Sequence, residues 1–141
     1  MPVDEQMFPA RLAMLPETAA FVQAFCDRCG IERDDAMRLT LIIEELFTNT
    51  VEHGHRGDTD APIRIALSVH SGGVDVLYED SAPRYDPIAR LSGSPAGIAR
   101  PVEARPVGGL GAYLVGQLVQ RSSYIYEDGR NRLRLTLLLA P

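Results

Sequence analysis

Three polar side chains recur at every fourth position in one short stretch of the chain. They are the carboxylate of Glu45, the amide of Asn49 and the imidazole of His53. With about 3.6 residues per helical turn, such side chains share one face of an α-helix. A carboxylate can act as a general base, and an amide oxygen can bind a metal ion. The spacing predicts part of a functional site, although the same side chains could also cap or pair on a solvated helix face.

The composition is that of a folded domain with its own core. The chain has 141 residues, of which 45% are hydrophobic and 23% are charged, so we expect one domain over residues 1–141. The net charge of −5 gives no overall field that would favour nucleic acid or an anionic membrane. The 14 basic residues are all arginines, which excludes mechanisms that need a P-loop or Schiff-base lysine. No transmembrane-length apolar run or signal-peptide pattern is present, and a cytoplasmic location is expected.

The two cysteines, Cys26 and Cys29, could form a redox motif or half of a zinc site. No second cysteine pair exists, and the three histidines do not have finger-like spacing to this one. The pair also lies at the end of an apolar helical pattern rather than after a strand. We therefore predict two unpaired thiols on the last turn of a helix.

Hydrophobic periodicity predicts the secondary structure before the middle of the chain. Residues 8–15 read as an edge strand, and a helix from Pro16 ends at Gly30. A second helix is expected from about residue 34 to His53. Its predicted core residues are Met37, Leu41, Ile42, Leu46 and Val51.

The remaining periodic segments predict strands and one more helix. Strands are expected over 63–70 and 74–80, joined by a hairpin turn at Ser71-Gly72-Gly73, and over 123–127 and 133–139, around a turn at Asp128-Gly129. A helix is expected over 111–121. This order predicts an α+β fold, a two-layer sandwich in which helices cover one face of a mixed, mostly antiparallel sheet.

Two further motifs and the loop between them could complete a site. Asp80 ends a predicted strand, where its carboxylate could accept a hydrogen bond from a ligand or simply cap a turn. Gly108, Gly109, Leu110 and Gly111 lead into a predicted helix, where backbone amides could bind phosphate or the glycines could only end a loop. The aperiodic segment 81–109 is long enough to be functional, and its part at about 88–107 is a predicted lid. Its arginines could meet phosphates or remain solvated: Arg90, Arg100 and Arg105.

The segment from Glu45 to Asn49 comes first in the chain, Asp80 second and the segment from Gly108 to Gly111 third. These three motifs, in this order, resemble the N, G1 and G2 boxes of the GHKL ATPase superfamily. Gyrase, histidine kinases and mismatch-repair ATPases belong to this superfamily. Within it, the chain most resembles the anti-sigma-factor serine/threonine kinases over residues 8–139. Further motifs carry this closer resemblance: His53-Gly54, Tyr85-Asp86-Pro87 and the segment from Asp128 to Leu133.

The resemblance implies a Bergerat-type ATP-binding fold, with ATP and Mg2+ as cofactors. Glu45 would be the general base, and Asn49 would bind Mg2+. Asp80 would bind the adenine amino group. Ala82 and the segment from Gly108 to Gly111 would also contact nucleotide. At Ala82 the family usually has glycine, so this chain brings a methyl group toward the base pocket.

The resemblance also implies a role in transcription regulation by partner switching. The chain would bind a sigma factor or an anti-anti-sigma antagonist, phosphorylate the antagonist on serine or threonine, and form a homodimer, without direct contact with nucleic acid or a membrane. The alternative is a nucleotide-binding sequestering module of the same fold that lacks kinase activity. A separate histidine-kinase catalytic domain fits less well, because no helix with a phosphorylatable histidine precedes the domain.

Overall fold

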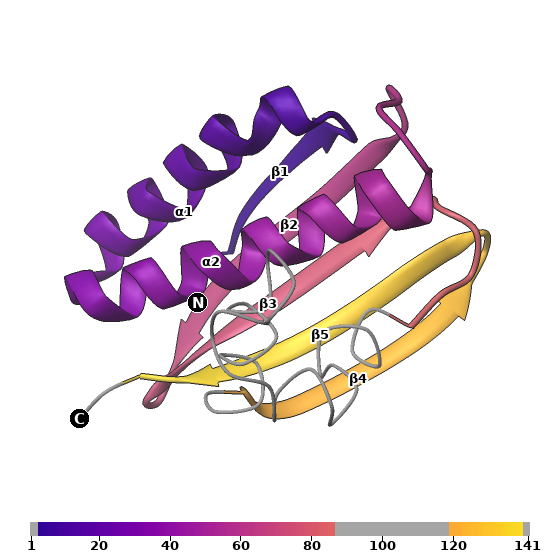
Figure 1. Ribbon diagram of the computed structural model, residues 1–141. Coiled ribbons are helices and arrows are strands. Elements are labelled where there is room, and N and C mark those ends of the chain that lie inside the picture. Colours follow the sequence, from indigo (N-terminus) through magenta and orange to yellow (C-terminus); the bar gives the residue numbers. More distant parts are fainter. Residues whose placement is uncertain (1–2, 87–118, 140–141) are drawn as a thin grey trace, which may run out of the picture.

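The computed structural model describes residues 3–86 and 119–139. Within these ranges, two long helices lie side by side across one face of a five-stranded sheet (Figure 1). The helices are α1 (Leu15–Cys29) and α2 (Arg33–Asn49). The strands are β1 (Asp4–Pro9), β2 (Pro62–His70), β3 (Gly73–Asp80), β4 (Val119–Glu127) and β5 (Arg130–Leu138). The predicted two-layer α+β sandwich is confirmed.

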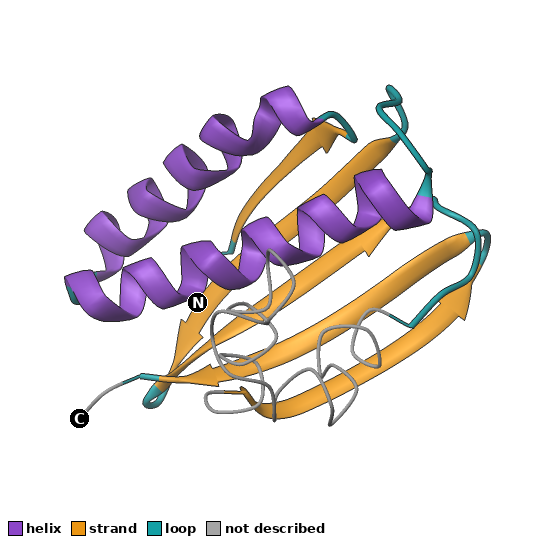
Figure 2. Ribbon diagram, viewed as in Figure 1, coloured by secondary structure: helices purple, strands orange, loops and turns teal. Residues whose placement is uncertain are grey.

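The strands follow the order β1-β2-β3-β5-β4, and each neighbouring pair among the described strands is antiparallel (Figure 2). The central strand β3 therefore lies between β2 and β5. In this register Asp80, the last residue of β3, lies opposite Asn131 on β5 and Ile63 on β2. The sheet thus places a carboxylate and an amide from distant parts of the sequence next to each other.

Both predicted hairpin turns are confirmed, and each uses residues with positive φ. Gly72 has a φ of 76° between β2 and β3. Between β4 and β5, Asp128 has a φ of 54° and Gly129 a φ of 74°. Two successive positive φ angles are the signature of the turn type that matches the twist of antiparallel strands, and Asp-Gly is a favoured sequence for it.

The core lies between the two helices and the inner face of the sheet. Alternate residues of the central strands are buried there, as period-two patterning requires: Ile63, Ile65, Leu67, Val74, Val76, Tyr78, Leu133, Leu135 and Leu137. The ring of Phe8 on β1 packs edge-on against Phe21 of α1 and Phe47 of α2, with ring centroids 5.9 and 6.4 Å away. These contacts pack both helices against β1.

Two predictions near the N-terminus are wrong. The first strand spans Asp4–Pro9 rather than residues 8–15, and a short 3-10 turn at Leu12–Met14 leads into α1. Pro9 ends the strand well because it has no N–H to donate to a neighbour. Met37 is not in the core, since its side chain is 53% exposed. The buried face of α2 instead includes Ala36 and Leu39, which a helix places on another side from Met37.

The predicted helix over residues 111–121 is wrong at its C-terminal end. Strand β4 begins at Val119 and pairs with β5, with an irregularity in register between Val119 and Arg121. The rest of that predicted helix lies outside the described residues. Leu114, Val115, Leu118 and Val119 fit the spacing of a helix face, so periodicity alone did not show that Val119 belongs to the next strand.

Candidate functional site

The candidate site lies where the C-terminal end of α2, the end of β3 and the start of β5 come together (Figure 1). Asn49 is the last residue of α2, and a π-helical turn at Thr50–Gly54 follows it directly. Such wide turns are rare and occur often at functional sites. Here the turn carries the hydroxyl of the buried Thr50 toward the end of β3.

The carboxylate of Asp80 is the centre of this region. Its side chain is buried, and both oxygens accept hydrogen bonds. Oδ1 accepts from the backbone N–H of Ala82 at 3.0 Å and from Nδ2 of Asn131 at 2.9 Å. Oδ2 accepts from the hydroxyl of Thr50 at 2.9 Å and from that of Tyr85 at 2.8 Å. A carboxylate has about four lone-pair positions, so all the acceptor capacity of Asp80 is in use.

Three hydroxyl groups form a buried cluster next to this carboxylate. Thr50 Oγ1 lies 2.6 Å from the hydroxyl of Tyr78 and 2.8 Å from that of Tyr85. It also lies 3.1 Å from the backbone oxygen of Leu46, and the Tyr78 hydroxyl donates to the same oxygen at 3.1 Å. Because Thr50 has a single hydroxyl proton, it donates to one neighbour and accepts from others.

Tyr85 closes this cluster from the loop that follows β3. Its ring packs on the end of α2, close to Gly54. A Cβ atom added to Gly54 would lie 3.2 Å from Tyr85 Cε1 and 2.9 Å from the Cβ of Ala82. Burial and the neighbouring charge of Asp80 raise the pKa of Tyr85 above its usual value, so the phenol stays protonated. Glycine at position 54 is thus needed for close approach.

Asn131 holds the backbone of the same loop. Besides Asp80, its Nδ2 lies within hydrogen-bonding distance of the carbonyl oxygens of Ala82, at 3.0 Å, and Pro83, at 3.2 Å. Its Oδ1 accepts from the backbone N–H of Tyr85 at 3.1 Å and from the hydroxyl of Tyr124 at 2.6 Å. The side chain is buried, and each of its polar atoms has a partner. Asn131 therefore fixes the geometry of the loop relative to β5.

Glu45 lies one helical turn before Asn49 on α2, and both side chains are half-buried. Within residues 3–86 and 119–139, no side chain is hydrogen bonded to the Glu45 carboxylate. Burial raises the pKa of Glu45 to about 7, and repulsion from Glu44 and Glu52 adds to the shift. A carboxylate with a pKa near neutrality can take up and release a proton under physiological conditions, which is the property of a general base.

The structure brings together only some of the residues that the sequence singled out. Asp80 and Ala82 form one cluster with the end of α2, and Glu45 and Asn49 lie on the same helix. His53 is exposed in the π-helical turn. The predicted phosphate-binding segment and the loop arginines fall outside the described residues: Gly108, Gly109, Leu110, Gly111, Arg90, Arg100 and Arg105.

Four residues of the site were missed from the sequence: Thr50, Tyr78, Tyr85 and Asn131. Tyr85 and Asn131 had been noted only as parts of longer motifs. One signal was available for Asn131. A tight Asp128-Gly129 turn fixes the register of its hairpin, and an antiparallel neighbour that ends in Asp80 would place the amide opposite the carboxylate. Sequence alone does not give the strand order that makes them neighbours.

The two cysteines do not contribute to the site, and the prediction of unpaired thiols is confirmed. Cys26 is buried in the core and Cys29 is exposed at the end of α1. Burial raises the pKa of the Cys26 thiol to about 11, so it is unreactive. Among the described residues, no three His, Cys, Asp or Glu side chains form a group that could hold a metal ion.

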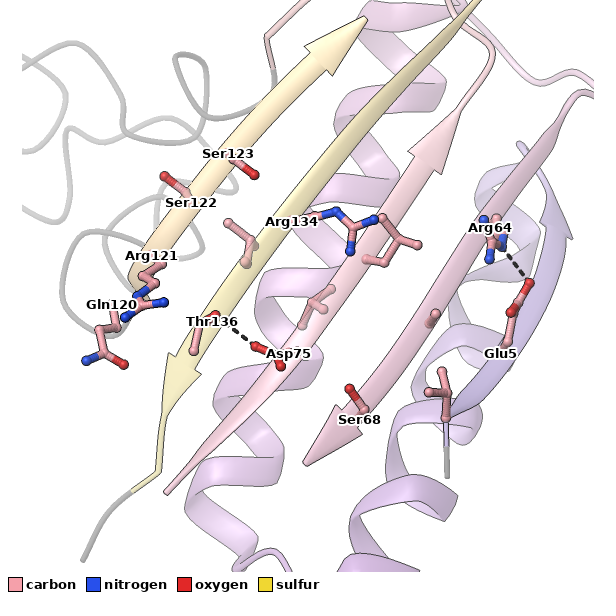
Figure 3. A pocket seen from close by; sticks show the side chains of 15 residues that line it. Glu5, Arg64, Ser68, Asp75, Gln120, Arg121, Ser122, Ser123, Arg134 and Thr136 are labelled. Carbon is pink, nitrogen blue, oxygen red and sulfur yellow. Dashed lines mark hydrogen bonds and ion pairs between the residues drawn. The ribbon is translucent and has the colours of Figure 1, made fainter. Parts of the chain in front are cut away.

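A broad hollow of about 950 Å3 lies on the sheet face that the helices leave open (Figure 3). Polar side chains from several strands line it, including Arg64, Asp75 and Arg134. Two interactions cross it: Arg64 with Glu5, and Thr136 with Asp75 at 2.8 Å. None of the sequence-predicted site residues lines this hollow, so it is separate from the site at Asp80.

In the described part of the chain, neither helix has the length and apolar character needed to cross a membrane.

The two-layer fold, with two helices over a five-stranded antiparallel sheet, is the architecture of a GHKL-type ATPase domain. Residues 8–137 match the family model of the histidine kinase-like ATPase domain. The match extends over most of the sequence, and the chain belongs to this family. The resemblance seen in the sequence is thereby confirmed at the level of the superfamily.

The chain is distantly similar in sequence to proteins named serine-protein kinase RsbW. The protein of that name from Bacillus cereus strain AH820 is 25% identical over 126 residues, which cover 89% of this chain and 78% of that protein. The one from Bacillus thuringiensis strain Al Hakam is 26% identical over 127 residues, with the same coverage. These identities indicate distant homology to the proteins of that name.

A solved structure supports the fold. The RsbU and RsbW domains of Rv1364c from Mycobacterium tuberculosis superpose with a TM-score of 0.66 and 18% sequence identity. The match covers 99% of this chain but only 33% of the solved chain. The similarity therefore concerns the architecture of one domain.

Proposed function

We propose that this protein is an ATP-dependent regulatory serine/threonine kinase that acts as an anti-sigma factor. In this proposal it phosphorylates an anti-anti-sigma antagonist and releases or captures a sigma factor accordingly. The observation that carries the proposal is the half-buried Glu45, whose pKa of about 7 suits a general base one turn from Asn49. The distant similarity to RsbW proteins supports the same class of activity.

The chemistry of the site residues fits the cofactors that the family implies. Asp80 offers a buried carboxylate suited to the amino group of adenine, and Asn49 offers a half-buried amide oxygen, a ligand type that Mg2+ accepts. Bound Mg-ATP would supply the transferable phosphoryl group together with the positive charge that stabilises its transfer. Glu45 would accept the proton of the substrate hydroxyl.

The remaining roles follow the family pattern. Ala82 would lie beside the base, next to Gly54. Gly108, Gly109, Leu110 and Gly111 would bind phosphates, and the segment at about 88–107 would act as a lid. The partners would be a sigma factor and an antagonist protein, bound by a homodimer in the cytoplasm.

The alternative is a sequestering module that binds nucleotide without transferring phosphate. One observation favours it: the acceptor positions of Asp80 are all occupied by groups of the protein itself. A base can bind only if one of these donors gives way. Breaking such a hydrogen bond costs free energy, so nucleotide would bind more weakly, which favours a module that retains nucleotide over a kinase that turns it over efficiently.

A phosphotransfer assay tests the proposal. The protein is incubated with Mg-ATP and the antagonist-like protein encoded nearest to it, and the intact mass of the antagonist is measured. We expect a phosphate-sized increase with the wild type, and none with Glu45→Gln. Glu44→Gln is the matched control, because Glu44 is the adjacent half-buried carboxylate on α2, and it should retain transfer. Nucleotide binding without any mass increase would support the sequestering module instead.

A further inference from the structure

The end of β3 holds a contact between Tyr85 and Asp80 to which the resemblance assigns no role. The phenol of Tyr85 donates to Asp80 Oδ2 at 2.8 Å, and its oxygen lies 2.8 Å from Thr50 Oγ1. We propose that Tyr85 is an internal competitor for the base, occupying the acceptor on Asp80 that the amino group of adenine would use. This inference rests on the proposed function, since it takes Asp80 as the residue that receives the base.

The phenol imitates the polar edge of the base in two respects. It presents a donor to Asp80, as the amino group of adenine would. Its oxygen also lies 2.8 Å from Thr50 Oγ1, so the single proton of Thr50 can go either to Asp80 Oδ2 or to this oxygen, as it could to a ring nitrogen next to that amino group. The aromatic ring meanwhile lies close to Gly54, where an added Cβ atom would come within 3.2 Å of Tyr85 Cε1. Tyr85 therefore makes the hydrogen bonds and the ring contact that a bound base would make.

The surrounding contacts allow the side chain to leave while the loop stays in place. Asn131 holds the loop through backbone atoms of Ala82, Pro83 and Tyr85. None of these bonds involves the Tyr85 ring, which can therefore rotate out without breaking them. Unlike Tyr78, which is buried, Tyr85 is only partly buried.

The hydroxyl cluster also remains satisfied when Tyr85 leaves. Thr50 can still donate to Asp80 Oδ2, and Tyr78 can still donate to the backbone oxygen of Leu46. A single lone pair of Asp80 becomes free, and it is the one that a ligand donor needs. The competitor thus keeps the buried carboxylate paired in the free protein, where an unpaired acceptor would be unfavourable.

The competition predicts a change in nucleotide affinity of a definite sign. When the competent state is a minor one, apparent affinity falls in proportion to its population. A hydrogen bond to a charged group contributes enough to shift such a population by about tenfold. Tyr85→Phe should therefore lower the dissociation constant of ADP by about tenfold, and Tyr85→Ala should lower it further because the ring is also removed.

Isothermal titration calorimetry with Mg-ADP tests this on the full chain. Tyr124→Phe is the matched control, since it removes a phenol that bonds to Asn131 and not to Asp80, and it should leave affinity unchanged. If Tyr85 were a wall of the base pocket, both Tyr85 variants would bind more weakly than the wild type, which would overturn the inference. Equal affinity for the wild type and both variants would overturn it too, while leaving nucleotide binding intact.

A second readout follows the side chain itself. The five tyrosines are labelled for NMR at the ring carbon that bears the hydroxyl. The tyrosine resonance that is missing from the spectrum of Tyr85→Phe then identifies Tyr85. Saturating Mg-ADP should move this resonance toward that of a solvent-exposed tyrosine and leave Tyr78 near its original position. Binding of ADP with an unmoved Tyr85 resonance would disprove displacement. If no variant binds ADP at all, the proposed function fails, and the role of Tyr85 fails with it.

Discussion

Asn131 donates a hydrogen bond from its side-chain amide to Oδ1 of Asp80 across 2.9 Å, although 51 positions separate the two residues. The contact exists because β3 and β5 pair with these residues directly opposite each other. One amide thereby orients the carboxylate and fixes the loop that carries Tyr85. The site depends on the sheet register as much as on the residues of its motifs.

Replacing Asn131 with alanine should destabilise the fold by about 2–4 kcal/mol, because several buried polar groups lose their partner at once. Urea unfolding measures this difference in free energy. Asn49→Ala is the control, since within the described residues the Asn49 side chain makes no hydrogen bond and only half of it is buried. Equal stability of the two variants would show that Asn131 does not hold the loop.

Phosphotransfer should depend on pH through Glu45. Because burial raises the pKa of this carboxylate to about 7, it is largely protonated below that pH and cannot accept a proton. The rate at saturating ATP should therefore rise about tenfold for each pH unit below neutrality and level off above about pH 8. Initial rates across this range measure the profile. A rate that stays constant down to pH 5 would exclude Glu45 as the base.

Glu45 should also affect stability with the opposite sense of pH dependence. Its folded pKa lies above the unfolded value of 4.5, so the folded state holds the proton more tightly, and stability decreases as pH rises between these values. Glu45→Gln removes this penalty and should stabilise the protein by about 1–2 kcal/mol above neutrality, after allowance for partial solvent screening. Below about pH 4 the gain should disappear.

Urea unfolding at several pH values provides this measurement. The matched variant Glu44→Gln removes a neighbouring charge that repels Glu45 and should give only a small gain. Equal effects of the two substitutions at every pH would mean that burial does not set the pKa of Glu45.

Gly54→Ala should disturb the contact between the helix end and the loop after β3. The new methyl would lie 2.9 Å from the Cβ of Ala82 and 3.2 Å from Cε1 of Tyr85, closer than normal packing permits. We expect a loss of about 1–3 kcal/mol in unfolding free energy. Adding Ala82→Gly should restore part of it, because it removes the nearer atom. A double-mutant cycle with no coupling between the two substitutions would contradict this packing.

Much of this protein was determined by local sequence. Period-two alternation gave the strands of the central hairpin, and turn residues such as Gly72 and Asp128-Gly129 gave their connections. These features depend on neighbours along the chain, so they could be predicted without knowledge of the fold. The spacing of Glu45 and Asn49 on one helix was equally local, and the three motifs in order led to the family that the family model confirms.

Other features depended on tertiary structure. The pKa of Glu45 is set by how deeply the packed helix buries it, which spacing does not reveal. The exposure of Met37 and the early start of β4 were decided by which helix face and which strand found a partner. The pairing of Asp80 with Asn131, Thr50 and Tyr85 requires a strand order that places distant segments together. Sequence determined which groups could do the chemistry, and packing decided which of them meet, because contact between distant residues follows from the arrangement of the whole sheet.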